Sequence, residues 1–166
     1  MVGVHLRLDP RELARAAREP HWVRAFADEV TAREAERAVG PSERRGHDLG
    51  KAWDGLRFLL ERRAFPVDLV HGEEGLPGAG DWGYGAPRVL VPERVRLAAD
   101  ALADLPFTAL LGDVTAADLA RSEVYPAGFW WDDESALPYL SAHHAALAAF
   151  VATAARYRHG LLVWSA

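Results

Sequence analysis

"DLGKAWDGLRFLL", residues 48–60, combines a helical periodicity with the only lysine of the chain, Lys51. At 100° per residue, its apolar side chains share one face of a helix: Leu49, Ala52, Trp53, Leu56, Leu59 and Leu60. The opposite side is mixed, because Gly55 and Phe58 lie there beside Lys51 and Asp54. We therefore predict a central helix packed on two sides, with Asp48 as its N-cap and Lys51 partly buried between Asp48 and Asp54.

The rest of the chain alternates between short strand patterns and longer helical patterns. We expect strands at residues 2–8, 65–72, 88–91 and 161–165. We expect helices at residues 9–19, 21–39, 92–105, 115–124 and 136–160, and loops at residues 40–48 and 72–87. With no repeat or linker to divide it, the chain is predicted to form one domain over residues 1–166. The fold class is α/β (α+β), helix-rich, with a small mixed β-sheet flanked by helices.

Composition excludes several classes of function. The net charge of −5 and the lack of a strongly basic run argue against a nucleic-acid partner. The absence of cysteine removes disulfides, thiol nucleophiles and cysteine-based metal sites. No apolar run reaches the ~18 residues that a membrane span needs, and the first residues lack the apolar core of a signal peptide. We expect a cytoplasmic protein with no membrane partner.

The glycine-rich stretch contains a literal G-x-G-x-x-G at Gly78, Gly80 and Gly83. In dinucleotide-binding proteins this motif opens a helix directly after a strand. Here Gly85 and Pro87 follow and prevent that helix, so we interpret the stretch as a loop. Seven histidines are present, but none has the spacing of a metal site. We predict no metal and no cofactor.

A polar group at the start of the 48–60 helix is the candidate for catalysis. Lys51, Asp54 and His47 lie close together in the sequence, and a desolvated lysine can act as a base or nucleophile. The alternative is an N-cap and an ion pair that fix the helix. The neighbouring carboxylates favour that alternative, because they stabilise the charged lysine.

An aromatic loop is the strongest candidate for recognition. Residues 125–131 contain Tyr125, Trp130 and Trp131, and adjacent tryptophans on a loop do not easily both point inward. Exposed aromatic side chains mark binding surfaces. Tyr84, in the glycine-rich loop, is expected to line the same cleft.

Three stretches together resemble a known family. "DLGKAWDGLRFLL", "YGAPRVLVPERV" and "SEVYPAGFW" are similar, in this order, to the YfbM-like family of small bacterial proteins, a family of unknown function. The similarity is most specific at Asp48, Lys51, Trp53 and Asp54, then at the Tyr125–Pro126 pair. The resemblance implies a single α/β domain and no established substrate, cofactor or reaction.

The leading hypothesis is a non-catalytic binding domain for a protein partner or a small polar ligand. The predicted binding residues are Asp48, Lys51, Trp53, Tyr84, Tyr125, Trp130 and Trp131. The alternative is a small-molecule enzyme that uses Lys51, Asp54 and His47, and the lack of a recognised catalytic set makes it the second choice.

Overall fold

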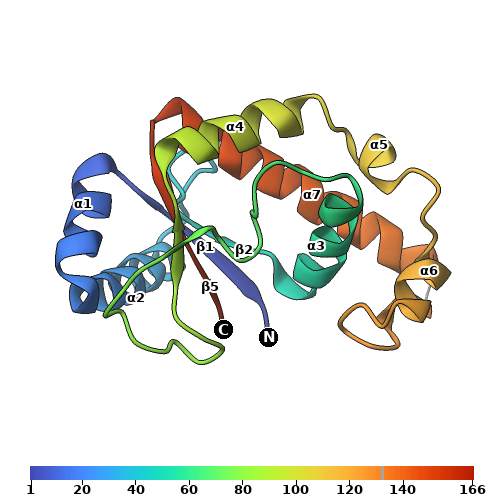
Figure 1. Ribbon diagram of the computed structural model, residues 1–166, viewed down its shortest axis with the longest axis horizontal. Helices are drawn as coiled ribbons and strands as arrows, with labels where there is room; N and C mark the ends of the chain where they lie inside the picture. The colour runs from blue at the N-terminus through green and yellow to red at the C-terminus, as the bar shows by residue number, and fades with distance from the viewer. Residues whose placement is uncertain (132) are drawn as a thin grey trace.

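A five-stranded antiparallel sheet organises the computed structural model, which describes residues 1–131 and 133–166 (Figure 1). The strands lie in the order β2-β1-β5-β4-β3. Their bounds are Gly46–Asp48 (β2), Gly3–Leu8 (β1), Gly160–Ser165 (β5), Arg88–Leu90 (β4) and Glu74–Gly75 (β3). The fold class is confirmed, but the pairing within the sheet differs from the prediction. Each described strand pair is antiparallel, so the sheet is not mixed.

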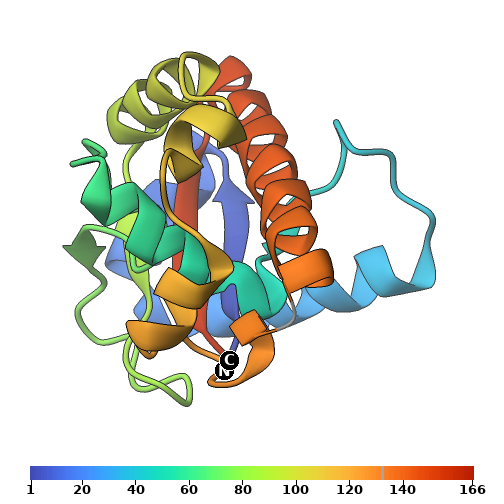
Figure 2. The same cartoon turned by 90° about the vertical axis from the view of Figure 1, so that its right-hand side faces the viewer.

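The first and last strands form the centre of the sheet. β1 pairs with β5 along its whole length, from Gly3 opposite Ser165 to Leu8 opposite Gly160. Both ends of the chain therefore lie side by side (Figures 1 and 2). Alternation along β1 sends Leu6 and Leu8 to one face of the sheet and His5 and Arg7 to the other.

Helices cover both faces of this sheet. Helices α1 (Pro10–Arg18) and α2 (Pro20–Glu36) pack on the face of Leu6 and Leu8. Helices α3 (Trp53–Arg62), α4 (Pro92–Ala103) and α7 (Asp133–Arg156) form the larger core on the other face, where α4 lies along α7 (Figures 1 and 2). Shorter elements link them: η1 (Gly50–Ala52), α5 (Phe107–Leu111), α6 (Ala116–Arg121) and η2 (Phe129–Trp131).

The helix predicted from residue 48 begins later than expected. Asp48 ends strand β2, and the regular helix α3 starts only at Trp53, after one turn of 3₁₀ helix. Gly50 has a φ of 53°, and the Asp48 carboxylate accepts the Gly50 N–H at 2.6 Å, so a turn separates strand from helix. The predicted apolar face is confirmed, because all six of its side chains are buried. The opposite side is packed too, since a Cβ added at Gly55 would meet the ring of Trp130 at 2.8 Å.

Two local predictions are wrong, and one short helix was not predicted. Residues 65–72 form turns instead of a strand, because Asp68 accepts the N–H groups of Val70 and His71 at 3.2 and 2.9 Å. Strand β2 lies inside the segment expected to be a loop, where only its pairing with β1 makes it a strand. The short helix α5 is an element that the pattern did not predict.

Candidate functional site

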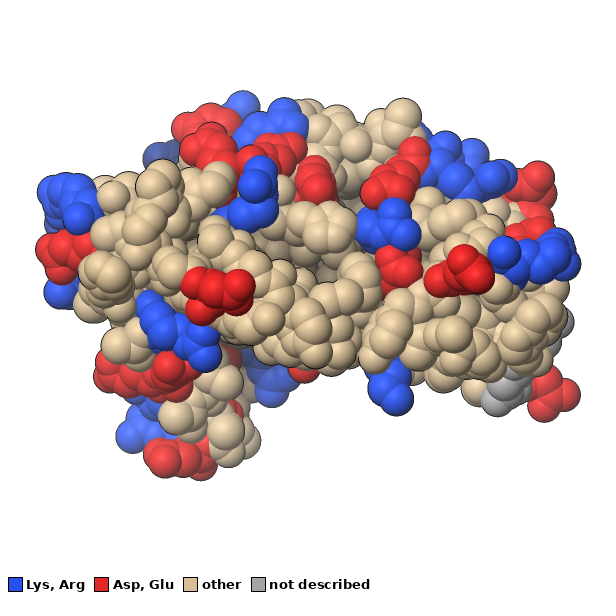
Figure 3. Space-filling view, turned by 60° about the horizontal axis from the view of Figure 1, so that its bottom comes forward, with Lys and Arg blue, Asp and Glu red and all other residues tan. Residues whose placement is uncertain are grey.

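The C-terminal part of α2 and the loop of residues 37–45 form an arm that stands away from the body beside α7 (Figure 2). A space-filling view shows this arm projecting from the molecule, with charges of both signs on it (Figure 3). Glu34, on α2, connects the arm to strand β2 through hydrogen bonds. One of its carboxylate oxygens accepts the Arg45 N–H at 2.5 Å and the other accepts the Gly46 N–H at 3.0 Å. The chain therefore enters β2, an edge strand, from a fixed position.

A cavity of about 910 Å³ lies between the arm, β2 and α7, and we call it the β2 groove. Its volume is within the range of small-molecule sites, roughly 300–1,000 Å³. The cavity follows the edge of the sheet at β2, between α2 on one face and α7 on the other, with these lining residues: Val2, Val4, Arg24, Asp28, Thr31, Ala32, Glu34, Ala35, Arg44, Gly46, His47, Asp48, His143, Ala146, Trp164 and Ala166.

A second cavity of about 440 Å³ lies between the loop of the arm and α7, and we call it the loop cavity. It shares Arg44, His47 and Ala146 with the β2 groove, so these residues border both spaces. Among the residues of β2, His47 alone lines both cavities, so it belongs to both parts of the site.

His47 is held on the sheet as a neutral imidazole. Its ring stacks on Phe150 at 5.0 Å between centroids and lies 6.1 Å from the ring of His5, its partner across the β1–β2 pair. Burial, followed by the nearby His5, His143 and Arg44, lowers the pKa of His47 to about 3. Within the described residues, its buried Nε2 atom has no hydrogen-bond partner. A buried polar atom of this kind is costly unless something bonds it.

Other polar groups face the same groove. His143 lines it from α7, and burial lowers the pKa of this histidine as well. Asp48, which is exposed, also lines the β2 groove. His143 contacts the ring of Tyr139 at 4.4 Å, and the Tyr139 hydroxyl accepts the backbone N–H of Lys51 at 3.1 Å. Contacts among these residues therefore connect the groove to the start of the central helix.

Lys51 does not occupy the environment that the sequence predicted. Its side chain is exposed, and no ion pair joins it to another of the described residues. The expected partners are engaged elsewhere: Asp48 with Gly50, and Asp54 with Arg57 and Tyr125. The reason is the late start of α3, because Lys51 lies outside the regular helix and does not share a helical face with Asp54.

Asp54 connects helix α3 to the aromatic loop. Its buried carboxylate accepts the Arg57 Nε–H at 2.5 Å and the backbone N–H of Tyr125 at 2.7 Å. The ring of Trp53, also buried, lies 5.9 Å from the ring of Tyr125. The candidate catalytic residues Lys51, Asp54 and His47 therefore have three different surroundings, and Asp54 has a structural role.

The aromatic loop places its two tryptophans in opposite environments. Trp130 is fully buried and donates from Nε1 to the Val124 carbonyl at 2.8 Å, so the prediction that it contacts a partner is wrong. Trp131 is 65% exposed, and Tyr125 is at the surface beside Trp53. The predicted protein partner at this loop now rests on Trp131 and Tyr125.

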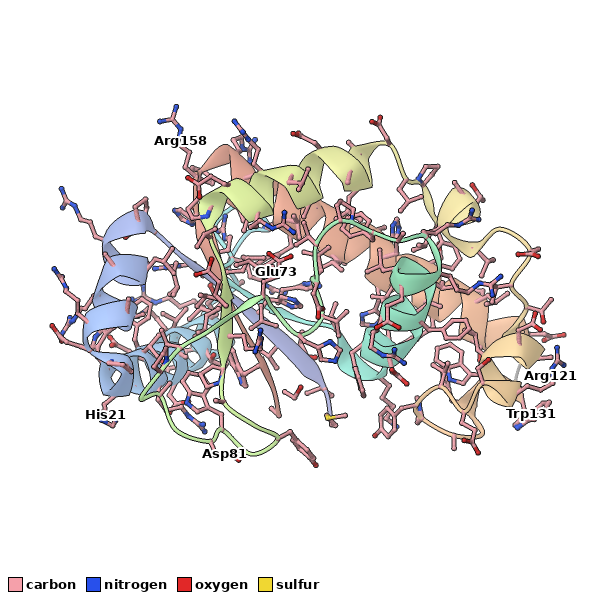
Figure 4. All side chains as sticks on the ribbon, viewed as in Figure 1. His21, Glu73, Asp81, Arg121, Trp131 and Arg158 are labelled. Atoms are coloured by element: carbon pink, nitrogen blue, oxygen red, sulfur yellow. The ribbon has the colours of Figure 1, made fainter. Side chains whose placement is uncertain are left out.

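Tyr84 is exposed but does not share a cleft with the aromatic loop. Figure 4 shows Asp81 of the glycine-rich loop and Trp131 at well-separated places on the molecule. The structure thus divides the predicted binding residues among the β2 groove, the aromatic loop and the glycine-rich loop. Asp48 is the member that lines the groove.

Sequence reasoning missed Arg44 and His143 as groove residues, and it gave no role to His5 or Arg7. One signal was present. In residues 2–8, histidine and arginine occupy alternate positions between valines and leucines, which places both on one face of a strand. The contributions of Arg44 and His143 have no such signal, because the arm and α7 meet only in three dimensions.

A family model described as "Domain of unknown function (DUF1877)" matches residues 1–164. The chain belongs to the DUF1877 family. The crystal structure of YfbM from Escherichia coli, a protein of unknown function, is similar to this DUF1877 chain with a TM-score of 0.64. The two are 17% identical over 98% of each chain, a likeness that shows the fold alone. No curated protein matches the chain. The predicted YfbM-like membership is thereby confirmed.

This DUF1877 structure has neither a membrane-spanning helix nor a metal-binding cluster among its described residues. Across residues 1–131 and 133–166, no helix is long and apolar enough to cross a membrane. In the same part of the chain, no three histidine or acidic side chains are grouped so that they could hold a metal ion.

Proposed function

We propose that this DUF1877 domain is a binding protein for a small polar molecule and that the ligand occupies the β2 groove. The observation that carries the proposal is a cavity of about 910 Å³ whose lining combines His47, His143 and Asp48 with apolar side chains. Its volume is within the range of small-molecule sites, roughly 300–1,000 Å³.

The lining of the groove suits a molecule with both polar and apolar parts. The polar part of the lining includes the neutral imidazoles of His47 and His143 and the carboxylate of Asp48. Val2, Val4 and Trp164 add apolar surface on the α2 side of the sheet edge. A few polar groups on an apolar surface are typical of small-molecule sites.

Binding without catalysis is favoured over the enzyme hypothesis. An enzyme of the predicted kind needs Lys51, Asp54 and His47 within reach of one substrate. Asp54 instead uses its carboxylate to hold Arg57 and the backbone of Tyr125, and Lys51 is exposed to solvent. The groove contains His47 but neither of the other two.

Filling the groove tests the proposal. Ala146 is exposed on α7 and lines the groove, so Ala146→Trp places a large side chain inside it without disturbing the core. Ala145→Trp is the matched control, because Ala145 is an exposed neighbour on the same helix and does not line the groove. A fragment library is screened by NMR against isotope-labelled wild-type protein and both variants.

We expect fragments that shift the amide signals of Gly46, His47 and His143 in the wild-type protein and in the Ala145→Trp variant. Ala146→Trp should abolish those shifts while the rest of the spectrum stays dispersed. Fragments that bind equally well to Ala146→Trp, or only outside the groove, would overturn the proposal.

A further inference from the structure

Arg7 is a buried arginine without a carboxylate partner. It lies on β1, facing α7, and is 3% exposed. Its Nη2 donates to the Ser42 carbonyl at 3.0 Å, whereas Nε and Nη1 have no partner within the described residues. Taking an arginine out of water is expensive unless an opposite charge compensates it. The buried charge of Arg7 therefore destabilises the free protein, and a bound anion nearby would reduce this electrostatic penalty.

The neighbouring charges do not compensate Arg7. Glu34 is the nearest acid that acts on it, but both carboxylate oxygens of Glu34 hold backbone N–H groups of the arm. Arg45 adds a second positive charge nearby and is itself paired with Glu12. Burial and the proximity of Arg45 lower the pKa of Arg7, as expected for a cation in a positive environment.

The loop cavity lies near this arginine, although Arg7 itself is not part of its lining. Two of its lining residues contact Arg7: Ser42 accepts the hydrogen bond from Nη2, and the ring of Phe150 lies 5.9 Å from the guanidinium carbon. Arg44 is the charged residue of the lining, its other polar residues are Ser42, His47 and Thr153, and the lining contains no aspartate or glutamate. A positive cavity stands out on a chain with a net charge of −5.

The remaining walls of the loop cavity are apolar. Val39, Pro41 and Ala149 lie there with Phe150. A free inorganic anion would gain nothing from these side chains, whereas an anion attached to an apolar group would bury that group as well.

We infer that the loop cavity binds the anionic end of the ligand, a carboxylate or a phosphate on an apolar body. The anion pairs with Arg44, and its negative charge offsets the nearby buried charge of Arg7. This inference rests on the proposed function, because His47 and Arg44 border both cavities.

Matched small probes test the charge preference. Benzoate and benzamide have nearly the same shape, and only benzoate is charged; phenyl phosphate and inorganic phosphate distinguish a phosphate preference and the contribution of the apolar ring. Affinities are measured by NMR titration of the full chain at up to about 10 mM probe. We expect benzoate or phenyl phosphate to bind at least about tenfold more tightly than benzamide, and phenyl phosphate more tightly than inorganic phosphate.

Three variants connect the preference to the site. Arg44→Gln removes an exposed charge and should reduce the preference for benzoate over benzamide to about threefold or less. Arg37→Gln is the control, because Arg37 lies on the same arm outside the loop cavity and should keep the full preference. Arg7→Met should also reduce the preference, and it should not lower the melting temperature of the free protein, since it removes an uncompensated buried charge.

The outcomes separate the inference from the proposed function. Equal affinity for benzoate and benzamide, with both lost in Ala146→Trp, would overturn the anion inference and leave the groove as a binding site. No binding of any aromatic probe at about 10 mM, or benzoate binding unaffected by Arg44→Gln and Ala146→Trp, would also overturn the inference. Only the failure of the fragment screen at the groove would overturn the proposed function.

Discussion

Adjacent residues of this protein have different roles, one in packing and one at the surface, and the two tryptophans of the aromatic loop show this most clearly. Trp130 fills the space above Gly55 and bonds the Val124 carbonyl, so it joins the aromatic loop to the central helix. Trp131, one position later, projects into solvent beside Arg121 (Figure 4). A contact role for this loop therefore depends on Trp131, and the stability of the loop depends on Trp130.

Alanine substitutions should separate these two tasks. Trp130→Ala is expected to reduce the free energy of unfolding by about 3–5 kcal/mol, because it leaves a large cavity between the loop and α3. Trp131→Ala should change it by about 0.5 kcal/mol or less, as expected for an exposed side chain. Urea denaturation measures both, and a loss of similar size in the two variants would contradict the assignment.

At the scale of elements, α3 is central because one of its sides packs in the main core and the other contacts the aromatic loop. Its apolar face is buried in the main core, and its opposite side meets Trp130 and Leu140 through Gly55. Asp54 is the polar connection between α3 and the aromatic loop, since its carboxylate bonds the Tyr125 backbone as well as Arg57.

Asp54→Asn tests this connection. The amide has a single acceptor oxygen where the carboxylate has two, so either Arg57 or the Tyr125 N–H loses its partner in a buried place. We expect a loss of about 1–3 kcal/mol in the free energy of unfolding. Glu61→Gln is the control, because Glu61 bonds the same arginine at the surface and should cost about 0.5 kcal/mol or less. Equal effects in a calorimetric comparison would show that Asp54 does not join the two elements.

At the scale of the whole molecule, the sheet separates two cores, and one of its faces carries buried basic side chains. His5 is fully buried with Nε2 2.6 Å from the Leu69 carbonyl, and it lies beside His47 and Arg7 on that face. Burial lowers the pKa of His5 and of His47, so folding keeps both rings neutral. The stability of the molecule therefore depends on pH.

Stability should fall as the pH drops below about 6.5. A histidine whose folded-state pKa is lowered takes up its proton more readily in the unfolded chain, so protons favour unfolding between the unfolded value near 6.5 and the folded value, which is about 3 for His47. Each such histidine costs up to about 1.4 kcal/mol per pH unit in this window. The effect of His71 is opposite in sign, because a hydrogen bond with Asp68 raises its pKa, but the pair is exposed and weakly coupled.

Urea midpoints between about pH 7.5 and pH 5.5 measure this slope above the range where carboxylates take up protons. His47→Leu should reduce this slope, and the remainder should come from His5, His143, His144 and His159, because burial lowers the pKa of each. His21→Leu, at an exposed position on α2, should leave the slope unchanged (Figure 4). A wild-type slope of zero, or equal slopes in the wild type and His47→Leu, would contradict the role of the buried rings.

Local chemistry explains which predictions succeeded. The helix expected at residues 9–19 begins where predicted, because the Asp9 cap and Pro10 in the first helical position act over one turn of chain. The apolar face of residues 49–60 was readable because burial follows the helical period. Predictions that needed distant partners failed: β2 exists through its pairing with β1, and Lys51 is exposed because Gly50 delays the helix.

The sequence by itself determined the family, the fold class, the main helices and the three inner strands β1, β5 and β4, since periodicity, caps and signature residues are all local. Only the tertiary structure decided the candidate site. The β2 groove and the loop cavity are built from α2, the arm, β2 and α7, which are separated by roughly a hundred residues of chain. The uncompensated charge of Arg7 likewise depends on its surroundings in the fold, because the sequence does not show whether a carboxylate lies near an arginine in the folded protein.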